Sequence, residues 1–190
     1  MLFIYWINKI LSRNIFSGIL VAILILSRVS GVYADVLFDS TSNPVFNSDL
    51  VTKGVTLNAS FSTNDRPVNL KELTLLWRRL KNEEGLISIH LLADNNATPG
   101  MSLDMLAEVN ARTLPVGEQF LTIPIKIQKP LNANSRYWIQ IRATDNSGSM
   151  TYSRKHEGFG VKSEYYLNMY GLHRNDETGP YIFKIEGVPQ

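Results

Sequence analysis

Apolar and polar residues alternate with a period of two over most of the chain from residue 51 onward. This alternation predicts β-strands rather than helices. In the first clear segment Val55, Leu57, Ala59 and Phe61 point to one side, with polar residues between them. The pattern predicts a strand with one buried and one solvated face.

Two further segments predict a hairpin. Alternating apolar residues at 73–77 precede a charged turn at 81–85, and the alternation returns at 87–93. The turn ends at Gly85, and glycine adopts positive φ without a steric cost. We therefore expect 73–77 and 87–93 to pair with each other.

Six more segments carry a strand pattern, namely 105–109, 121–127, 137–143, 150–153, 165–170 and 181–186. Pro124 interrupts the second of these, and it predicts an edge strand because proline has no N–H to donate to a neighbour. We expect Trp77 and Trp138 to be largely buried. The sequence contains no convincing amphipathic helix of ten or more residues.

Seven to nine short strands separated by turns, without helical crossovers, favour an all-β fold. The most consistent architecture is an antiparallel β-sandwich of jelly-roll type, and a closed barrel is the alternative. Because no internal repeat or low-complexity linker interrupts the pattern, we expect a single domain at residues 36–188.

Residues 1–34 have the organisation of a signal peptide. Lys9 and Arg13 form a basic start, residues 15–26 form an apolar run, and the small residues Val32 and Ala34 occupy the positions that a signal peptidase recognises. The sequence predicts cleavage after Ala34. An uncleaved membrane anchor is the alternative, although the run is shorter than the roughly 20 apolar residues of a membrane span.

Charge and cysteine content narrow the classes of function. The 190-residue chain has a net charge of +2. Removal of Lys9, Arg13 and Arg28 with the leader leaves 16 basic and 17 acidic residues, or −1. That balance favours neither nucleic acid nor anionic lipid as a partner, so we expect no membrane insertion after cleavage. Since cysteine is absent, disulfides, thiolate nucleophiles and lipid-bearing cysteines are excluded.

The sequence shows no catalytic motif, so we predict no catalytic residue and no cofactor, and an enzyme is the least favoured class. His156, His173 and Glu157 could approach a metal ion, but the histidine spacing matches no standard ligand motif. We therefore predict no metal site there. Residues 94–96, Asp-Asn-Asn, carry oxygen ligands suited to calcium, but an Asx turn before Pro99 is the favoured interpretation.

The last third of the chain is rich in aromatic and basic residues. Tyrosine and arginine are enriched in protein interfaces, aromatic faces can stack on sugar rings, and aromatic side chains also fill cores. The candidate interface consists of Tyr152, Arg154, Phe159, Tyr165, Tyr166, Tyr170 and Arg174. Core packing and a sugar site remain the two alternatives for this set.

Several segments, taken in order, resemble the choice-of-anchor R domain family of exported bacterial proteins. They are 57–63 (LNASFST), 73–76 (LTLL), 89–95 (IHLLADN) with Pro99-Gly100, and 131–139 (LNANSRYWI). The similarity covers about residues 55–153. It implies a secreted or surface-held β-sandwich module. The family's usual C-terminal anchor has no counterpart in residues 181–190.

These observations favour an exported, non-catalytic binding or assembly module. The expected partner is an envelope or surface protein, or an extracellular polymer, and the expected location is the periplasm, the cell surface or the medium. A carbohydrate-binding domain with an aromatic stacking site is the alternative.

Overall fold

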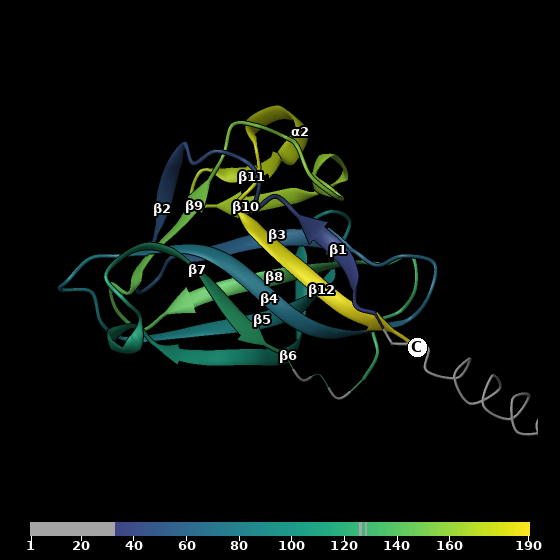
Figure 1. The fold of residues 1–190 in the computed structure, drawn as a ribbon, viewed down its shortest axis with the longest axis horizontal. Helices are drawn as coiled ribbons and strands as arrows, with labels where there is room; N and C mark the ends of the chain where they lie inside the picture. The colour runs from purple at the N-terminus through teal and green to yellow at the C-terminus, as the bar shows by residue number, and fades with distance from the viewer. Residues whose placement is uncertain (1–32, 126, 128) are drawn as a thin grey trace, which may run out of the picture. The chain divides into compact units, whose positions relative to one another are not determined.

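Twelve strands form two antiparallel sheets in the part of this computed structural model that is described, residues 33–125, 127 and 129–190 (Figure 1). The first sheet contains β1 (Asp35–Asp39), β12 (Phe183–Pro189), β4 (Val68–Arg79), β9 (Gly148–Tyr152), β2 (Asn47–Val51) and β7 (Gly117–Pro124). The second contains β11 (Gly171–Arg174), β10 (Tyr165–Asn168), β3 (Thr56–Ser62), β8 (Arg136–Ala143), β5 (Leu86–Asp94) and β6 (Pro99–Asn110). The predicted leader lies outside the described residues, apart from Tyr33 and Ala34.

The strand order confirms the predicted jelly-roll sandwich. In the first sheet the pairings give β1-β12-β4-β7, and in the second they give β3-β8-β5-β6. The chain passes repeatedly from one sheet to the other, so each four-strand set contains strands from both halves of the sequence. Strands β2, β9, β10 and β11 extend the sandwich at the top of Figure 1. The two separate sheets exclude the closed barrel.

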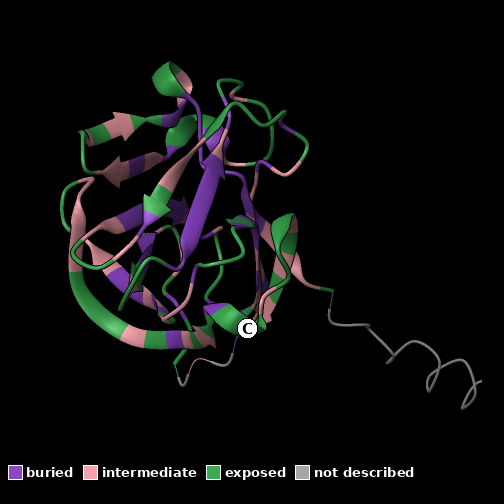
Figure 2. Ribbon diagram, turned by 90° about the vertical axis from the view of Figure 1, so that its left-hand side faces the viewer, coloured by how far each residue is buried: buried purple, intermediate pink, exposed green. Residues whose placement is uncertain are grey.

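Apolar residues at alternate strand positions form the core of the sandwich. In Figure 2 buried residues alternate with less buried ones along several strands. Leu57 and Phe61 of β3 are at most 1% exposed, and Leu73 and Leu75 of β4 are equally buried. This is the result expected from period-two alternation, because residues i and i+2 of a strand share one face. Trp77 is 1% exposed, so its predicted burial is confirmed.

Strand β3 is buried on both faces, so the predicted solvated face is wrong. Its polar residues Asn58 and Ser60 are 2% and 0% exposed. The buried carboxylate of Glu164, just before β10, accepts a hydrogen bond from the Ser60 hydroxyl. On neighbouring β8, Trp138 is fully buried as predicted, and its Nε1 donates to Asp94 Oδ1 at 2.8 Å.

The predicted hairpin of 73–77 with 87–93 is also wrong. Strand β4 lies in the first sheet, whereas β5 lies in the second and pairs with β6 and β8. Alternation does not reveal which sheet a strand joins. The hairpin that does form is β5–β6. Its turn residues Asn96 and Ala97 have φ of 53° and 61°, the backbone that a two-residue hairpin turn requires.

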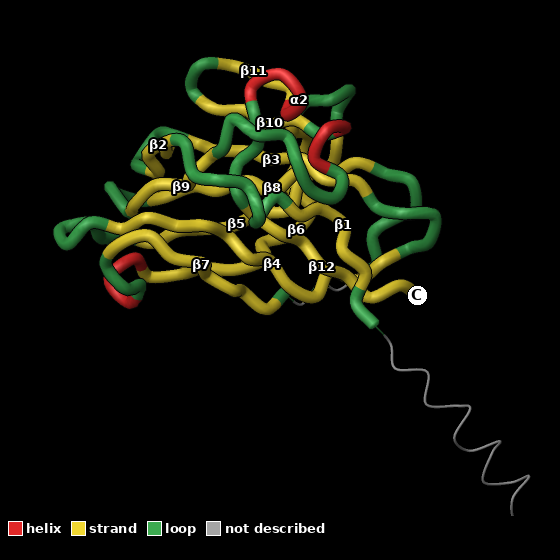
Figure 3. Tube along the Cα trace, turned by 45° about the horizontal axis from the view of Figure 1, so that its top comes forward, coloured by secondary structure: helices red, strands yellow, loops and turns green. Residues whose placement is uncertain are grey.

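Strand β7 pairs with β4 alone among the described strands, and Pro124 is its last residue, which confirms the predicted edge strand. Helix is limited to short turns in the described chain, η1 (Ala111–Thr113), η2 (Val161–Ser163) and α2 (Asn175–Thr178) (Figure 3). None of the described helices has the length and apolar character needed to span a bilayer.

Candidate functional site

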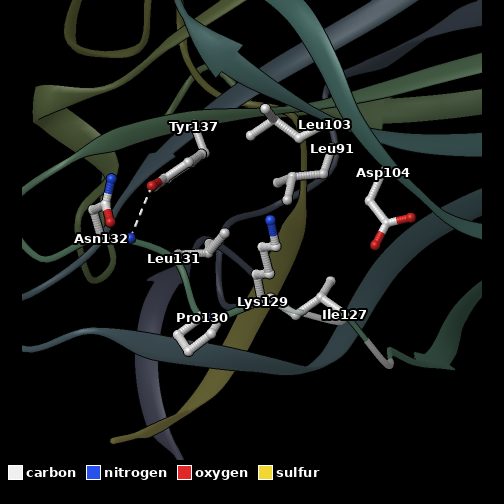
Figure 4. A pocket seen from close by; sticks show the side chains of 9 residues that line it. All are labelled: Leu91, Leu103, Asp104, Ile127, Lys129, Pro130, Leu131, Asn132 and Tyr137. Atoms are coloured by element: carbon white, nitrogen blue, oxygen red, sulfur yellow. Dashed lines mark hydrogen bonds between the residues drawn. The ribbon is translucent and has the colours of Figure 1, made fainter.

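A pocket opens where strands β5, β6 and β8 of the second sheet face the connection from β7 to β8 (Figure 4). Its volume is about 550 Å³, within the range typical of small-molecule sites. The lining residues are Leu91, Leu103, Asp104, Ile127, Lys129, Pro130, Leu131, Asn132 and Tyr137. Three of them, Leu91, Leu131 and Tyr137, are at most 7% exposed and belong to the core, so the pocket reaches the interior of the sandwich.

Two charged groups of opposite sign stand at the mouth of this pocket. In Figure 4 the Lys129 ammonium lies between the Tyr137 hydroxyl and the Asp104 carboxylate. Tyr137 Oη accepts a hydrogen bond from the backbone N–H of Asn132 at 2.9 Å, and Asp104 Oδ1 accepts one from Met105 N at 2.8 Å. Among the described residues, the second oxygen of Asp104 accepts no hydrogen bond.

A β-bulge shapes the rim of the pocket on β6. Leu91 pairs with Asp104 and Leu92 with Ser102, so Leu103 is an additional residue on the β6 side. Bulges redirect side chains and are frequent beside functional sites. Here the bulge brings Leu103 and Asp104 into the same pocket lining.

The predicted interface set is divided between the interior and the surface. Tyr152 and Tyr166 belong to a continuous series of rings that also contains Phe46, Tyr181 and His173. Neighbouring centroids in this series are 5.9, 6.3, 5.1 and 4.8 Å apart, in the order Phe46, Tyr152, Tyr181, Tyr166, His173. Tyr166 is 7% exposed, so its ring faces are occupied by the protein itself.

Asp49 of β2 ties this aromatic series to the rest of the sandwich. Its Oδ2 accepts hydrogen bonds from Tyr181 Oη at 2.6 Å and from Asn168 Nδ2 at 2.8 Å. Burial, followed by the nearby negative charge of Asp49, raises the pKa of Tyr181 far above its ordinary value. Tyr181 therefore remains a hydrogen-bond donor, and Asp49 joins β2 to β10 and to the segment that leads into β12.

The other members of the predicted set lie at the surface on several elements. The Arg136 guanidinium covers the Tyr165 ring at 4.9 Å, and Arg174 pairs with Asp176 at 2.7 Å. Arg154 lies over the ring of Phe46 at 3.6 Å. The two remaining members are exposed aromatic residues, Phe159 and Tyr170.

Sequence reasoning missed most of the apolar surface around Tyr170. Met169 and Tyr170 form the turn between β10 and β11 and are 72% and 76% exposed, and Leu172 of β11 is 43% exposed. This hairpin lies beside β2 in Figures 1 and 3, consistent with the Asn168–Asp49 hydrogen bond. Next to β2, Phe46 is 46% exposed, and Leu50 within the strand is 57% exposed. We call Phe46, Leu50, Met169, Tyr170 and Leu172 the hairpin patch.

The sequence did contain a sign of this exposed surface. Two large apolar residues stand directly before Gly171, at a turn, where small and polar residues are usual.

The histidines form no metal centre in the described part of the chain, where no three His, Cys, Asp or Glu side chains converge. His173 stacks on Tyr166, and His156 lies in the loop after β9. His90 is on the outer face of β5, opposite Gln140. Burial, and then the positive charge of Arg142, lower its pKa.

Asp94 uses both carboxylate oxygens within the protein. Oδ1 accepts from Trp138 and Oδ2 accepts from Ala97 N at 3.2 Å. The backbones of Asn95 and Thr98 also bond to each other in both directions. The structure therefore shows a two-residue hairpin turn at Asn96 and Ala97 that the Asp94 side chain supports, and not the expected Asx turn, because the bond reaches the third residue on and not the second.

Comparison with known proteins assigns this chain to no family. No protein-family model matches the chain, and neither does any curated protein. The resemblance to the choice-of-anchor R domains therefore stays a prediction.

Proposed function

We propose that this protein is an exported, non-catalytic binding module that attaches to a protein of the cell envelope or cell surface through the hairpin patch. The observation that carries the proposal is the exposure of five large apolar side chains, from 43% to 76%, on two neighbouring elements. Large exposed apolar side chains on neighbouring elements often mark an interaction site.

The composition of the hairpin patch suits a protein partner. Interfaces are enriched in tyrosine, phenylalanine, methionine and arginine, and Arg154 lies directly on Phe46 at the edge of the patch. Methionine also adapts to irregular partner surfaces because its side chain is unbranched and polarizable. A sugar site on Tyr165 and Tyr166 is less favoured, because Arg136 covers the first ring and the second is buried.

The support beneath the patch favours a preformed surface. Asp49 fixes β2 to Asn168, the residue immediately before the exposed Met169-Tyr170 turn. A surface that is already ordered loses less conformational entropy on association than a mobile loop does.

A photo-reactive benzoylphenylalanine at position 170 is expected to crosslink the protein to a discrete envelope or surface protein in the native host. The matched control is the same amino acid at position 120, since Phe120 is 49% exposed on β7 and lies outside the patch. The measurement is immunoblotting and mass spectrometry of crosslinked species. Equal crosslinking from positions 170 and 120, or none from position 170, would contradict the proposal. Selective binding on a glycan array would instead favour the carbohydrate-binding alternative.

The proposed export predicts a specific N-terminus for the mature protein. Protein recovered from outside the cytoplasm is expected to begin at Asp35, because Val32 and Ala34 fit the signal-peptidase rule. N-terminal sequencing of that material measures the start directly. A chain that still begins at Met1 in the membrane fraction would show an uncleaved anchor.

A further inference from the structure

We propose that the pocket between β6 and the β7–β8 connection binds a small zwitterion with an apolar body, of the free amino-acid or dipeptide class. This site is separate from the hairpin patch, and the inference does not depend on the proposed function. It rests on the pocket's volume, its apolar floor and the placement of its two charged groups.

The floor of the pocket is apolar and continuous with the core. Leu91 comes from β5, and Leu131 comes from the connection that leads into β8. Leu103 on the rim is 48% exposed, so an apolar group entering the pocket would remove its side chain from water. Burial of that apolar surface favours a ligand with a hydrocarbon side chain.

The mouth of the pocket carries a cation and an anion that do not form an ion pair with each other in the described chain. Lys129 and Asp104 are not among the ion pairs closer than 4.0 Å in the described chain. A ligand carboxylate can approach the Lys129 ammonium and accept the Tyr137 hydroxyl proton. A ligand ammonium can approach Asp104 Oδ2, the oxygen that accepts no hydrogen bond from the described residues. Hydrogen bonds between charged groups are stronger than neutral ones, and both ligand charges are then matched.

This arrangement disfavours ligands that carry one charge. A simple anion would bind Lys129 but leave Asp104 as an unmatched negative group, and a simple cation would leave Lys129 unmatched. Lys129 and Asp104 lie on separate elements, one in the connection to β8 and the other at the β6 bulge. A ligand must therefore carry a negative and a positive group at the two places where Lys129 and Asp104 can contact them.

The test uses leucine and leucyl-leucine as probes, with two analogues of leucine that each lack one charge. 3-Methylbutylamine lacks the carboxylate, and 4-methylpentanoate lacks the ammonium. Titration of the purified protein by ¹H–¹⁵N NMR is expected to show saturable binding of leucine or its dipeptide, with shift changes confined to the pocket lining. Each single-charge analogue is expected to bind about tenfold more weakly, the factor that corresponds to one lost charge-assisted contact.

Two variants assign the charges. Lys129→Gln is expected to weaken leucine and 4-methylpentanoate about tenfold and to leave 3-methylbutylamine unchanged. Asp104→Asn is expected to weaken leucine and 3-methylbutylamine and to leave 4-methylpentanoate unchanged. The matched controls are Lys53→Gln and Asp145→Asn, at exposed residues outside the pocket. Asp145 Oδ1 accepts from the next backbone N–H at 2.8 Å, as Asp104 Oδ1 does, so its replacement reproduces the local backbone change.

Unchanged melting temperatures establish that the variants are folded before affinities are compared. The proposal would be overturned if neither leucine nor leucyl-leucine showed saturable binding. It would also be overturned if the two analogues bound as tightly as leucine, or if Lys129→Gln and Asp104→Asn behaved like their controls.

Discussion

Replacement of Trp138 with alanine is expected to lower the free energy of unfolding by about 3 to 5 kcal/mol. The indole is fully buried on the outer face of β8, so its loss leaves a cavity, and it also removes the donor to Asp94 Oδ1. A small domain is stable by only about 5 to 15 kcal/mol, so this variant loses a large part of its stability. Chemical denaturation followed by circular dichroism measures the change.

The control for Trp138 is an exposed aromatic residue. Tyr170→Ala removes a side chain that is 76% exposed and is expected to change the free energy of unfolding by less than about 0.5 kcal/mol. Similar midpoints for Trp138→Ala and the unsubstituted protein would mean that the outer face of β8 is not packed as described.

Replacement of Arg136 with methionine is expected to destabilise the fold by about 3 to 5 kcal/mol. The Glu164 side chain is 1% exposed, and it accepts hydrogen bonds from Ser60, Ser62 and, at 3.0 Å, from Arg136 Nε. Methionine preserves much of the apolar stem but leaves a buried carboxylate without its cationic partner. The removal of one member of a buried pair is costly because the remaining charge stays out of water.

Two comparisons separate this charge effect from lost packing. Glu164→Gln combined with Arg136→Met is expected to be less destabilising than Arg136→Met alone, because the double variant has no unpaired charge. The exposed pair of Arg112 and Glu84 supplies the surface control, and Arg112→Met is expected to cost at most about 1 kcal/mol. Strictly additive effects of Arg136→Met and Glu164→Gln would contradict a coupled buried pair.

Alternation predicted the all-β class and most central strands because side-chain direction is a local property of the backbone. Segment 137–143 became β8, and Pro124 identified the edge strand β7, both from residues within the segment itself. The partner of a strand is a non-local property. The pattern at 73–77 and 87–93 would be the same in a hairpin as in the crossover between sheets that the structure contains.

The candidate sites depended still more on distant residues. Leu91, Asp104 and Lys129 come from three segments of the chain, so no local motif could bring them together. The aromatic residues in the last third of the chain have two different roles, since Tyr166 fills the interior while Tyr170 faces solvent. Their different exposures follow from the positions of β10 and its turn in the sheet.

The pairing of β1 with β12 determines when this sandwich can be completed. Asp35 pairs with Gly187, and the ring of Phe38 stacks on Phe183 at 4.1 Å. A chain that crosses a membrane with its N-terminus leading, as the proposed export requires, delivers β1 first and its partner strand last. Contacts between such distant segments also form slowly, because the loop between them must close first. Under the proposed export, β1 would stay unpaired on the far side of the membrane until β12 arrives, and Phe38 would be exposed there in the meantime.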